Sequence, residues 1–198
     1  MSRLLILVAA FAMFTLPVSA QTVEEIVGRY LKTIGGADKI QAVQTLRRSG
    51  KYIGGGGFEA VFVQENKRGS LVREEFSLQG MTAINAYDGT TGWMLMPFQG
   101  NKDPQKMTEE QLKDIRTETT VNMMGQDIET ETSIGDYKEV NGLYFPYSME
   151  SHQKGKEGMG GRAILIDKIE LDPKVDAAMF TMPAVAAKPV EKSEPKKQ

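Results

Sequence analysis

The stretch Tyr137-Lys-Glu-Val-Asn-Gly-Leu-Tyr-Phe-Pro-Tyr-Ser-Met-Glu-Ser151 predicts a strand, a tight turn and a second strand. Asn141-Gly142 favours a hairpin turn, because both central positions of such a turn need a positive φ. Alternation along the second strand predicts one apolar face, made of Leu143, Phe145, Tyr147 and Met149. Pro146 cannot donate to a ladder, so we expect this strand to lie at a sheet edge or to carry a bulge.

Two short helices are expected to precede the sheet. Thr22 and Glu25 have the spacing of a capping box. An apolar stripe at helical spacing follows, formed by Val23, Ile26, Val27, Tyr30, Leu31 and Ile34. Gly35-Gly36 ends this helix, and residues 37–43 predict a second one. We expect this helical region to cover one side of the sheet.

The next part of the chain predicts a β-meander, because short alternating runs are separated by turn residues. The expected strands are Thr45–Ile53, Phe58–Gln64, Leu71–Leu78, Met81–Tyr87 and Trp93–Phe98. The glycine run Gly54–Gly57 is interpreted as a flexible turn. It lacks the strand–loop–helix frame and the Lys-Ser/Thr pair of a phosphate-binding loop.

The second half of the chain predicts a helix, further strands and a final helical turn. Thr108 and Gln111 can form a capping box for a helix over residues 108–115. The expected strands are Thr117–Met124, Asp127–Ile134 and Arg162–Leu171. A short helical turn over residues 176–180 should tuck Met179 and Phe180 under the sheet. The whole is expected to be an α+β protein with one large, curved, mostly antiparallel sheet.

Both ends of the chain are predicted to lie outside this domain. Residues 1–20 have the positive start, apolar run and small residues of a signal peptide, with cleavage expected after Ala20. No Cys follows for lipid attachment. Residues 184–198 predict a disordered tail, rich in Ala, Lys, Glu and Pro. One exported domain is therefore expected over residues 21–183.

The composition excludes several classes of function. The formal net charge is −2, so there is no electrostatic case for a nucleic-acid partner. The chain has no Cys and one His, His152, which excludes a thiol nucleophile, a disulfide framework and a His/Cys zinc site. No nucleophile–base set is visible, so we expect neither an enzyme nor a cofactor.

The apolar residues offer a candidate ligand-binding surface. They are Phe58, Phe62, Phe76, Leu78, Trp93, Leu95, Leu143, Phe145, Tyr147 and Met149. A curved sheet closed on one side by helices can enclose a lipid-sized space. The 12 methionines suit a surface that accepts ligands of variable shape. The alternative interpretation is that the same residues only fill a core.

The order of these features resembles the LolA/LolB-like superfamily of outer-membrane lipoprotein-sorting proteins. The resemblance rests on the helix ending in Gly-Gly, on Asp88-Gly-Thr-Thr-Gly-Trp93, on Asp136–Pro146 and on Ile169-Glu-Leu-Asp172 leading to Phe180 and Pro183. It implies an unclosed β-barrel, or half-barrel, lined with apolar side chains and lidded by helices. It also implies a periplasmic role in outer-membrane biogenesis, carrying acyl chains of lipoproteins or other lipids between membranes. The family's lid arginine matches no motif here.

Two functions are therefore expected from the sequence. The first is a periplasmic, non-enzymatic carrier that binds acyl chains on an apolar concave face. The second is a regulatory or sensor module that docks another envelope protein through the half-barrel. Envelope membrane proteins stay open as further partners.

Overall fold

The structure, a computed structural model, describes residues 21–109, 111–112, 121–123, 126–128, 130–153 and 161–184. The expected signal peptide and nearly all of the expected tail lie outside these residues. The helical elements are α1 (Val23–Thr33), α2 (Ala37–Ala42), η1 (Pro97–Gln99) and η2 (Ala177–Phe180). The strands are β1 (Thr45–Ile53), β2 (Glu59–Lys67), β3 (Leu71–Leu78), β4 (Met81–Asp88), β5 (Gly92–Leu95), β6 (Gln105–Lys106), β7 (Val121–Met123), β8 (Gln126–Ile128), β9 (Thr130–Val140), β10 (Leu143–Gln153) and β11 (Arg162–Leu171).

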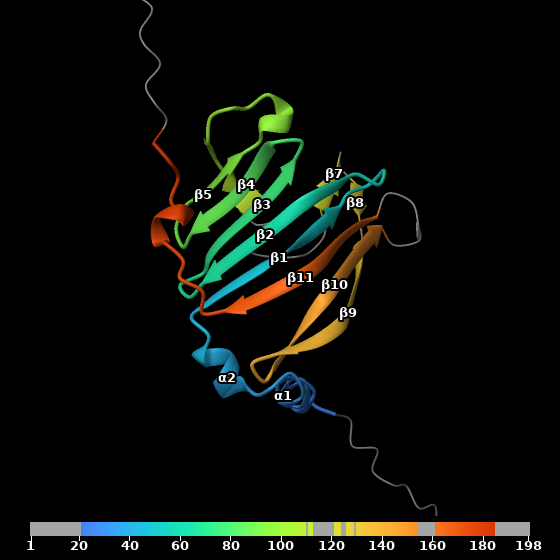
Figure 1. Cartoon of the computed structure of the whole chain (residues 1–198). Coiled ribbons are helices and arrows are strands. Elements are labelled where there is room, and N and C mark those ends of the chain that lie inside the picture. Colours follow the sequence, from blue (N-terminus) through green and yellow to red (C-terminus); the bar gives the residue numbers. More distant parts are fainter. Residues whose placement is uncertain are drawn as a thin grey trace, which may run out of the picture.

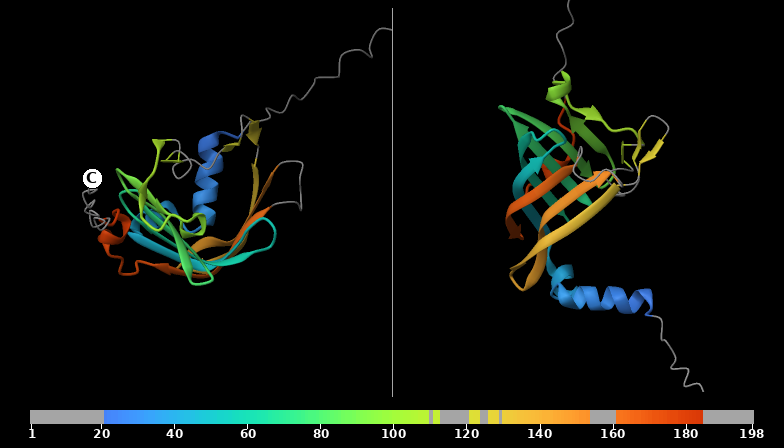
Figure 2. Two further views of the ribbon diagram at one scale, coloured as in Figure 1. Left: turned by 90° about the horizontal axis from the view of Figure 1, so that it is seen from above. Right: turned by 90° about the vertical axis from the view of Figure 1, so that its right-hand side faces the viewer.

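The main sheet contains nine strands in the order β6-β5-β4-β3-β2-β1-β11-β10-β9, and every pair is antiparallel. It curves into a trough that does not close (Figures 1 and 2). The last strand in sequence, β11, lies beside the first, β1, and joins the meander to the β9–β10 hairpin. The described residues therefore confirm the expected large antiparallel sheet.

Local turn chemistry accounts for much of this sheet. Asn141 and Gly142 have φ values of 53° and 77°, as the hairpin between β9 and β10 requires. In the turn after β4, the backbone N–H groups of Thr91 and Thr90 donate to the Asp88 carboxylate and lower its pKa below the usual value. The strands β1, β3 and β11 match their expected bounds.

Pro146 lies on an inner strand, so the expected edge position is wrong. β10 pairs with β9 from Leu143 to Gln153, but with β11 only from Ser148 to Ser151. The register with β9 keeps the same offset on both sides of Pro146, although the ladder skips the next pair, Tyr147 and Asp136, where Asp136 has a φ of 51°. Proline is tolerated here because the β10–β11 ladder starts beyond it, so no bond from its nitrogen is missing.

The segment after β11, residues 172–180, covers part of the convex face, and we call it the C-terminal segment. Figure 2 shows η2 outside the curve of the sheet. Trp93 and Phe180 are fully buried there, and the Trp93 indole Nε1–H donates to the Phe180 carbonyl at 2.7 Å. Arg73 donates to the Met179 carbonyl at 2.8 Å and lies 5.5 Å from the Trp93 ring centroid. The expected tucking of Phe180 under the sheet is thus confirmed, on the convex side.

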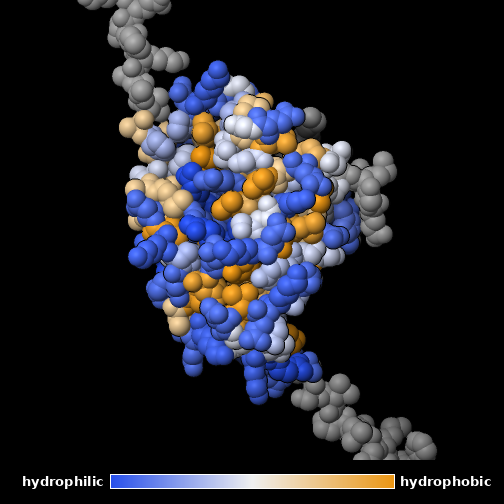
Figure 3. Space-filling view, viewed as in Figure 1, coloured by the Kyte–Doolittle hydropathy of each residue, from blue (hydrophilic) through white to orange (hydrophobic). Residues whose placement is uncertain are grey.

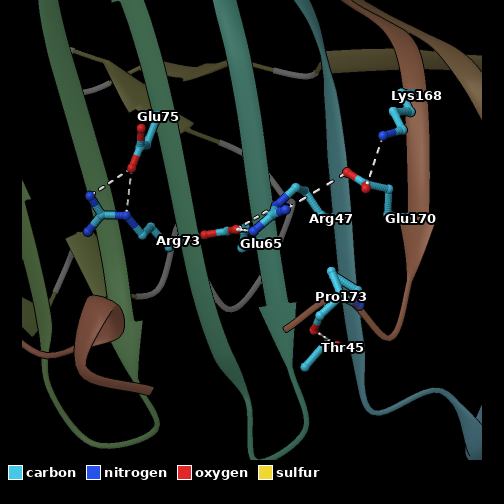
Figure 4. A network of polar contacts seen from close by, with 8 residues as sticks. All are labelled: Thr45, Arg47, Glu65, Arg73, Glu75, Lys168, Glu170 and Pro173. Atoms are coloured by element: carbon cyan, nitrogen blue, oxygen red, sulfur yellow. Dashed lines mark hydrogen bonds and ion pairs between the residues drawn. The ribbon is translucent and has the colours of Figure 1, made fainter. Parts of the chain in front are cut away.

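The rest of the convex face is largely charged. Figure 4 shows Arg47 between the carboxylates of Glu65 and Glu170, with Lys168 completing the row. The Arg47 Nε–H donates to Glu65 at 2.6 Å, and Glu65 is only 4% exposed. Figure 3 shows this face as mainly hydrophilic, with scattered apolar residues. Alternation therefore leaves the opposite, concave face as the candidate for an apolar surface.

Helix α1 does not cover the sheet as expected. The capping box of Thr22 and Glu25 is formed in both directions. The helix projects beyond the end of the sheet where the β9–β10 turn lies (Figure 2). Its attachment is local: the Tyr144 N–H donates to the Ile34 carbonyl at 2.9 Å. Partial burial, together with a hydrogen bond to Tyr30, raises the pKa of Tyr137.

Candidate functional site

The concave face carries a continuous apolar cluster over the centre of the sheet. Phe62 on β2 and Ile166 and Ile169 on β11 are buried at its middle. Half-buried side chains of β1, β3, β9, β10 and β11 surround them; these are Leu46, Tyr52, Phe76, Val140, Phe145, Tyr147, Met149, Ile164 and Leu171. We call this set the concave cluster.

Register and backbone geometry explain why these side chains meet. Phe62 pairs with Phe76 on β3 and with Gly50 on β1. The ring centroids of Phe62 and Phe76 are 5.4 Å apart, and Tyr52 approaches Phe76 edge-on at 5.1 Å. At the register shift between β1 and β11, a Cβ on Gly50 would lie 2.0 Å from the Leu165 carbonyl oxygen. Glycine is therefore needed where Ile166 turns in beside Phe62.

The hairpin that the sequence singled out supplies one wall of the concave cluster. Phe145, Tyr147 and Met149 lie on its concave side and are half-buried, as the alternation of β10 predicts. The Lys138 ammonium lies 4.4 Å from the Tyr147 ring centroid, from the neighbouring strand β9. Leu143 is buried at the end of the strand, close to Gly35 in the α1–α2 corner.

A second apolar cluster lies at the β5 side of the same face. Tyr87, Met107 and Leu112 are buried together, and Met94 packs against them. The expected capping box of Thr108 is formed, with the Thr108 N–H donating to Gln111 Oε1 at 2.9 Å. Leu112 acts as the expected apolar anchor, whereas Met107 was not expected. Residues 113–115 of the predicted helix lie outside the described part of the chain.

A polar row interrupts the apolar surface. Arg48, Gln64 and Glu74 occupy neighbouring positions on β1, β2 and β3. The Arg48 guanidinium donates to Gln64 Oε1, and Gln64 Nε2 donates to Glu74 at 2.6 Å. Sequence analysis missed this row. The signal was present, since Gln64 stands two residues after Phe62 and Glu74 two before Phe76, which puts both on the apolar face.

Most residues of the predicted ligand-binding surface lie on the concave side. Phe62, Phe76, Phe145, Tyr147 and Met149 belong to the concave cluster. Phe58 contacts Tyr52 at one end of this surface, with ring centroids 5.8 Å apart. Leu78 points to the same side by its register on β3.

Trp93 and Leu95 differ from the expectation, because they alternate onto the convex face. Trp93 pairs with Ala86 and is covered by Phe180, and Leu95 pairs with Ile84. Both side chains are therefore separated from the concave cluster by the sheet itself. The order of residues along β5 could not reveal which face of the sheet is concave.

Other chemistry is sparse in the described residues. The His152 imidazole lies 3.5 Å from a Glu131 carboxylate oxygen across the β9–β10 ladder, on the convex side. Among these residues there is no group of three or more His, Cys, Asp or Glu side chains placed to hold a metal ion. None of their helices is both long and apolar enough to cross a bilayer.

Comparison with known proteins adds no identification. No protein family matched the chain, and no curated protein was found to be similar to it.

Proposed function

We propose that this protein is a periplasmic carrier that binds acyl chains of lipoproteins or other lipids on its concave face and transports them between envelope membranes. The observation that carries the proposal is the concave cluster, which places half-buried aromatic and aliphatic side chains along one side of an unclosed sheet. An apolar surface that keeps partial exposure is suited to a ligand rather than to a closed core. The resemblance to lipoprotein-sorting proteins points to the same class of ligand.

The expected affinity for an acyl chain follows from the apolar area that the chain buries on binding. Each buried methylene contributes about 0.8 kcal/mol, so roughly ten methylenes of one chain contribute about 8 kcal/mol before ordering costs. After those costs, micromolar affinity needs a second stretch of chain or a contact to the head of the lipid. The concave cluster extends over β1, β2, β3, β9, β10 and β11, so a chain could contact several strands at once.

The test is a pair of neighbouring substitutions on β10. Met149 faces the concave cluster, and Ser148 beside it faces the convex side; both are half-buried. We expect Met149→Asp to reduce binding of a fatty-acyl probe at least about tenfold, because a carboxylate in the apolar surface must be desolvated by the chain. Ser148→Asp should leave binding unchanged. Equilibrium binding of a radiolabelled acyl probe measures both.

The two variants need a control for folding, and one binding result would contradict the proposal. Thermal unfolding of the two variants must stay close to that of the wild type, so that lost binding is not lost folding. Equal binding by wild type and Met149→Asp would exclude the concave cluster as the acyl site. Native mass spectrometry of protein purified without detergent should reveal a co-purifying fatty-acyl species.

The second candidate function is a module that docks another envelope protein. The observation that favours it is the stripe of α1, where Val23, Ile26, Val27 and Tyr30 are 71%, 51%, 48% and 52% exposed. This candidate requires that the wild type binds no acyl chain. It also requires that Val27→Asp, and not Met149→Asp, abolishes the function of the protein in the cell.

A further inference from the structure

Helix α1 leaves most of its apolar stripe exposed. Every residue from Gln21 to Tyr30 is exposed, so no element in the described part of the chain covers this length of the helix. The stripe continues on β9 with Tyr137, which is 42% exposed and shares a hydrogen bond with Tyr30. We call this set the α1 surface; its members are Val23, Ile26, Val27, Tyr30 and Tyr137.

We propose that the α1 surface docks the protein onto a lipid bilayer, with the helix lying in the plane of the lipid head groups. This inference rests on the proposed function, since it concerns how a carrier of acyl chains meets the bilayer that supplies or receives them. It adds the part of the protein that makes this contact, which the concave cluster does not specify.

The two sides of α1 suit a helix at the surface of a bilayer. By helical spacing, Glu25, Arg29 and Lys32 lie on the side away from the stripe, so they stay in water when the stripe enters the lipid. The two tyrosines suit the same boundary, because the ring is apolar and the hydroxyl can bond polar head groups. The helix has two acidic and two basic residues, so docking depends on apolar side chains rather than on attraction to anionic lipid.

The size of the α1 surface favours a bilayer over a second copy of the chain or a globular partner. A helix of 11 residues is about 16 Å long. A stable protein–protein interface buries about 800 Å² on each partner and takes roughly 20–30 residues from each side. The α1 surface offers far less. A bilayer sets no such threshold, because each apolar side chain that enters the lipid adds to the binding.

The α1 surface is joined to the proposed acyl site. The helix is attached at Ile34, whose carbonyl accepts from the Tyr144 N–H beside the β9–β10 turn. The same hairpin carries Val140 and Phe145 of the concave cluster close to that turn. Figure 2 shows α1 extending sideways from this end of the sheet. A helix lying on a bilayer therefore brings this end of the concave cluster close to the lipid, where an acyl chain enters or leaves.

Neighbouring substitutions on α1 test the docking. Val27 belongs to the α1 surface, whereas Gly28 lies on the polar side of the helix, where a Cβ would meet no atom within 4 Å. Val27→Asp should weaken binding to phosphatidylcholine vesicles at least about tenfold, because the carboxylate would have to lose water in the bilayer. Gly28→Asp adds the same charge and should bind like the wild type. Co-sedimentation with the vesicles measures binding, and thermal unfolding checks that both variants retain the fold.

The salt dependence of vesicle binding tests the force that is proposed. The wild type should bind the vesicles equally well at low salt and at about 0.5 M salt, where exposed charges are largely screened. Binding that disappears at high salt overturns the inference. The same holds if Val27→Asp binds as well as Gly28→Asp.

The outcomes separate this inference from the proposed function. Met149→Asp should lose the fatty-acyl probe and keep vesicle binding, whereas Val27→Asp should keep the probe and lose the vesicles. A wild type that binds vesicles but no acyl probe overturns only the carrier. A wild type that binds the probe but no vesicles overturns only the docking. Capture of an envelope protein by that wild type, and not by Val27→Asp, would then assign the α1 surface to a protein partner.

Discussion

At the residue scale, Glu65 shows how the structure retains a charge inside the fold. This carboxylate is 4% exposed, and its ion-pair partner Arg47 approaches to 2.5 Å. Both side chains alternate onto the convex face, where the C-terminal segment also runs. A buried charge of this kind is tolerated only while its partner is present.

Replacing Arg47 alone should therefore lower the free energy of unfolding more than replacing both Arg47 and Glu65. Arg47→Met leaves Glu65 uncompensated and should destabilise the protein by about 2–4 kcal/mol, a value reduced because the Arg47 side chain is one-third exposed. The double variant Arg47→Met with Glu65→Met should recover most of that loss. Urea denaturation of the single and double variants measures the effect. A double variant less stable than Arg47→Met would contradict this account.

At the scale of the element, α1 is a well-capped helix whose apolar stripe is not used by the sheet. The helix forms because its capping box and its spacing are both favourable. It is held at its C-terminal end, where Gly35 lies so close to the β9–β10 turn that a Cβ would sit 2.3 Å from the Gly142 carbonyl oxygen. The helix therefore contributes little to the core.

Matched substitutions of two isoleucines test this view of α1. Ile26 on α1 is 51% exposed, and Ile169 on β11 is 7% exposed. We expect Ile26→Ala to change the free energy of unfolding by no more than about 0.5 kcal/mol. Ile169→Ala should cost about 2–4 kcal/mol, since it leaves a cavity beside Phe62. Chemical denaturation measures both, and a large loss for Ile26→Ala would show that α1 packs elsewhere in solution.

At the scale of the whole molecule, the C-terminal segment ties the end of the chain to the meander. The Asp172 carboxylate accepts from the Gln44 and Thr45 N–H groups, and the Thr45 hydroxyl donates to the Pro173 carbonyl at 2.8 Å. From there the segment reaches Trp93, where Phe180 is fully buried. These contacts tie the C-terminal segment to β1, β3 and β5 on the convex side of the sheet.

The fluorescence of Trp93, the single tryptophan, reports whether Phe180 covers it. Phe180→Ala should remove about 3–5 kcal/mol of stability and admit water to Trp93, so its fluorescence emission should shift to longer wavelength. Lys174→Ala, at an exposed position of the same segment, is the control and should change neither quantity. An unshifted emission in folded Phe180→Ala would mean that water does not enter the site when Phe180 is shortened.

The sequence by itself determined the local elements and the relative facing of side chains within each strand. Asn141-Gly142 specified the hairpin turn, and the alternation of β10 specified that Phe145, Tyr147 and Met149 share a face. These features depend on neighbouring residues, so they can be read along the chain.

Only the tertiary structure decided which strands are neighbours and which face is concave. The pairing of β1 with β11 joins residues more than a hundred positions apart. β10 is an inner strand despite Pro146, because its ladder with β11 starts only at Ser148. The curvature of the sheet put Trp93 on the convex face, and the pairing of β1 with β2 and of β2 with β3 gathered Arg48, Gln64 and Glu74 into one row on the other. Alternation fixes two faces for each strand, but the curvature of the assembled sheet assigns them to the inside or the outside.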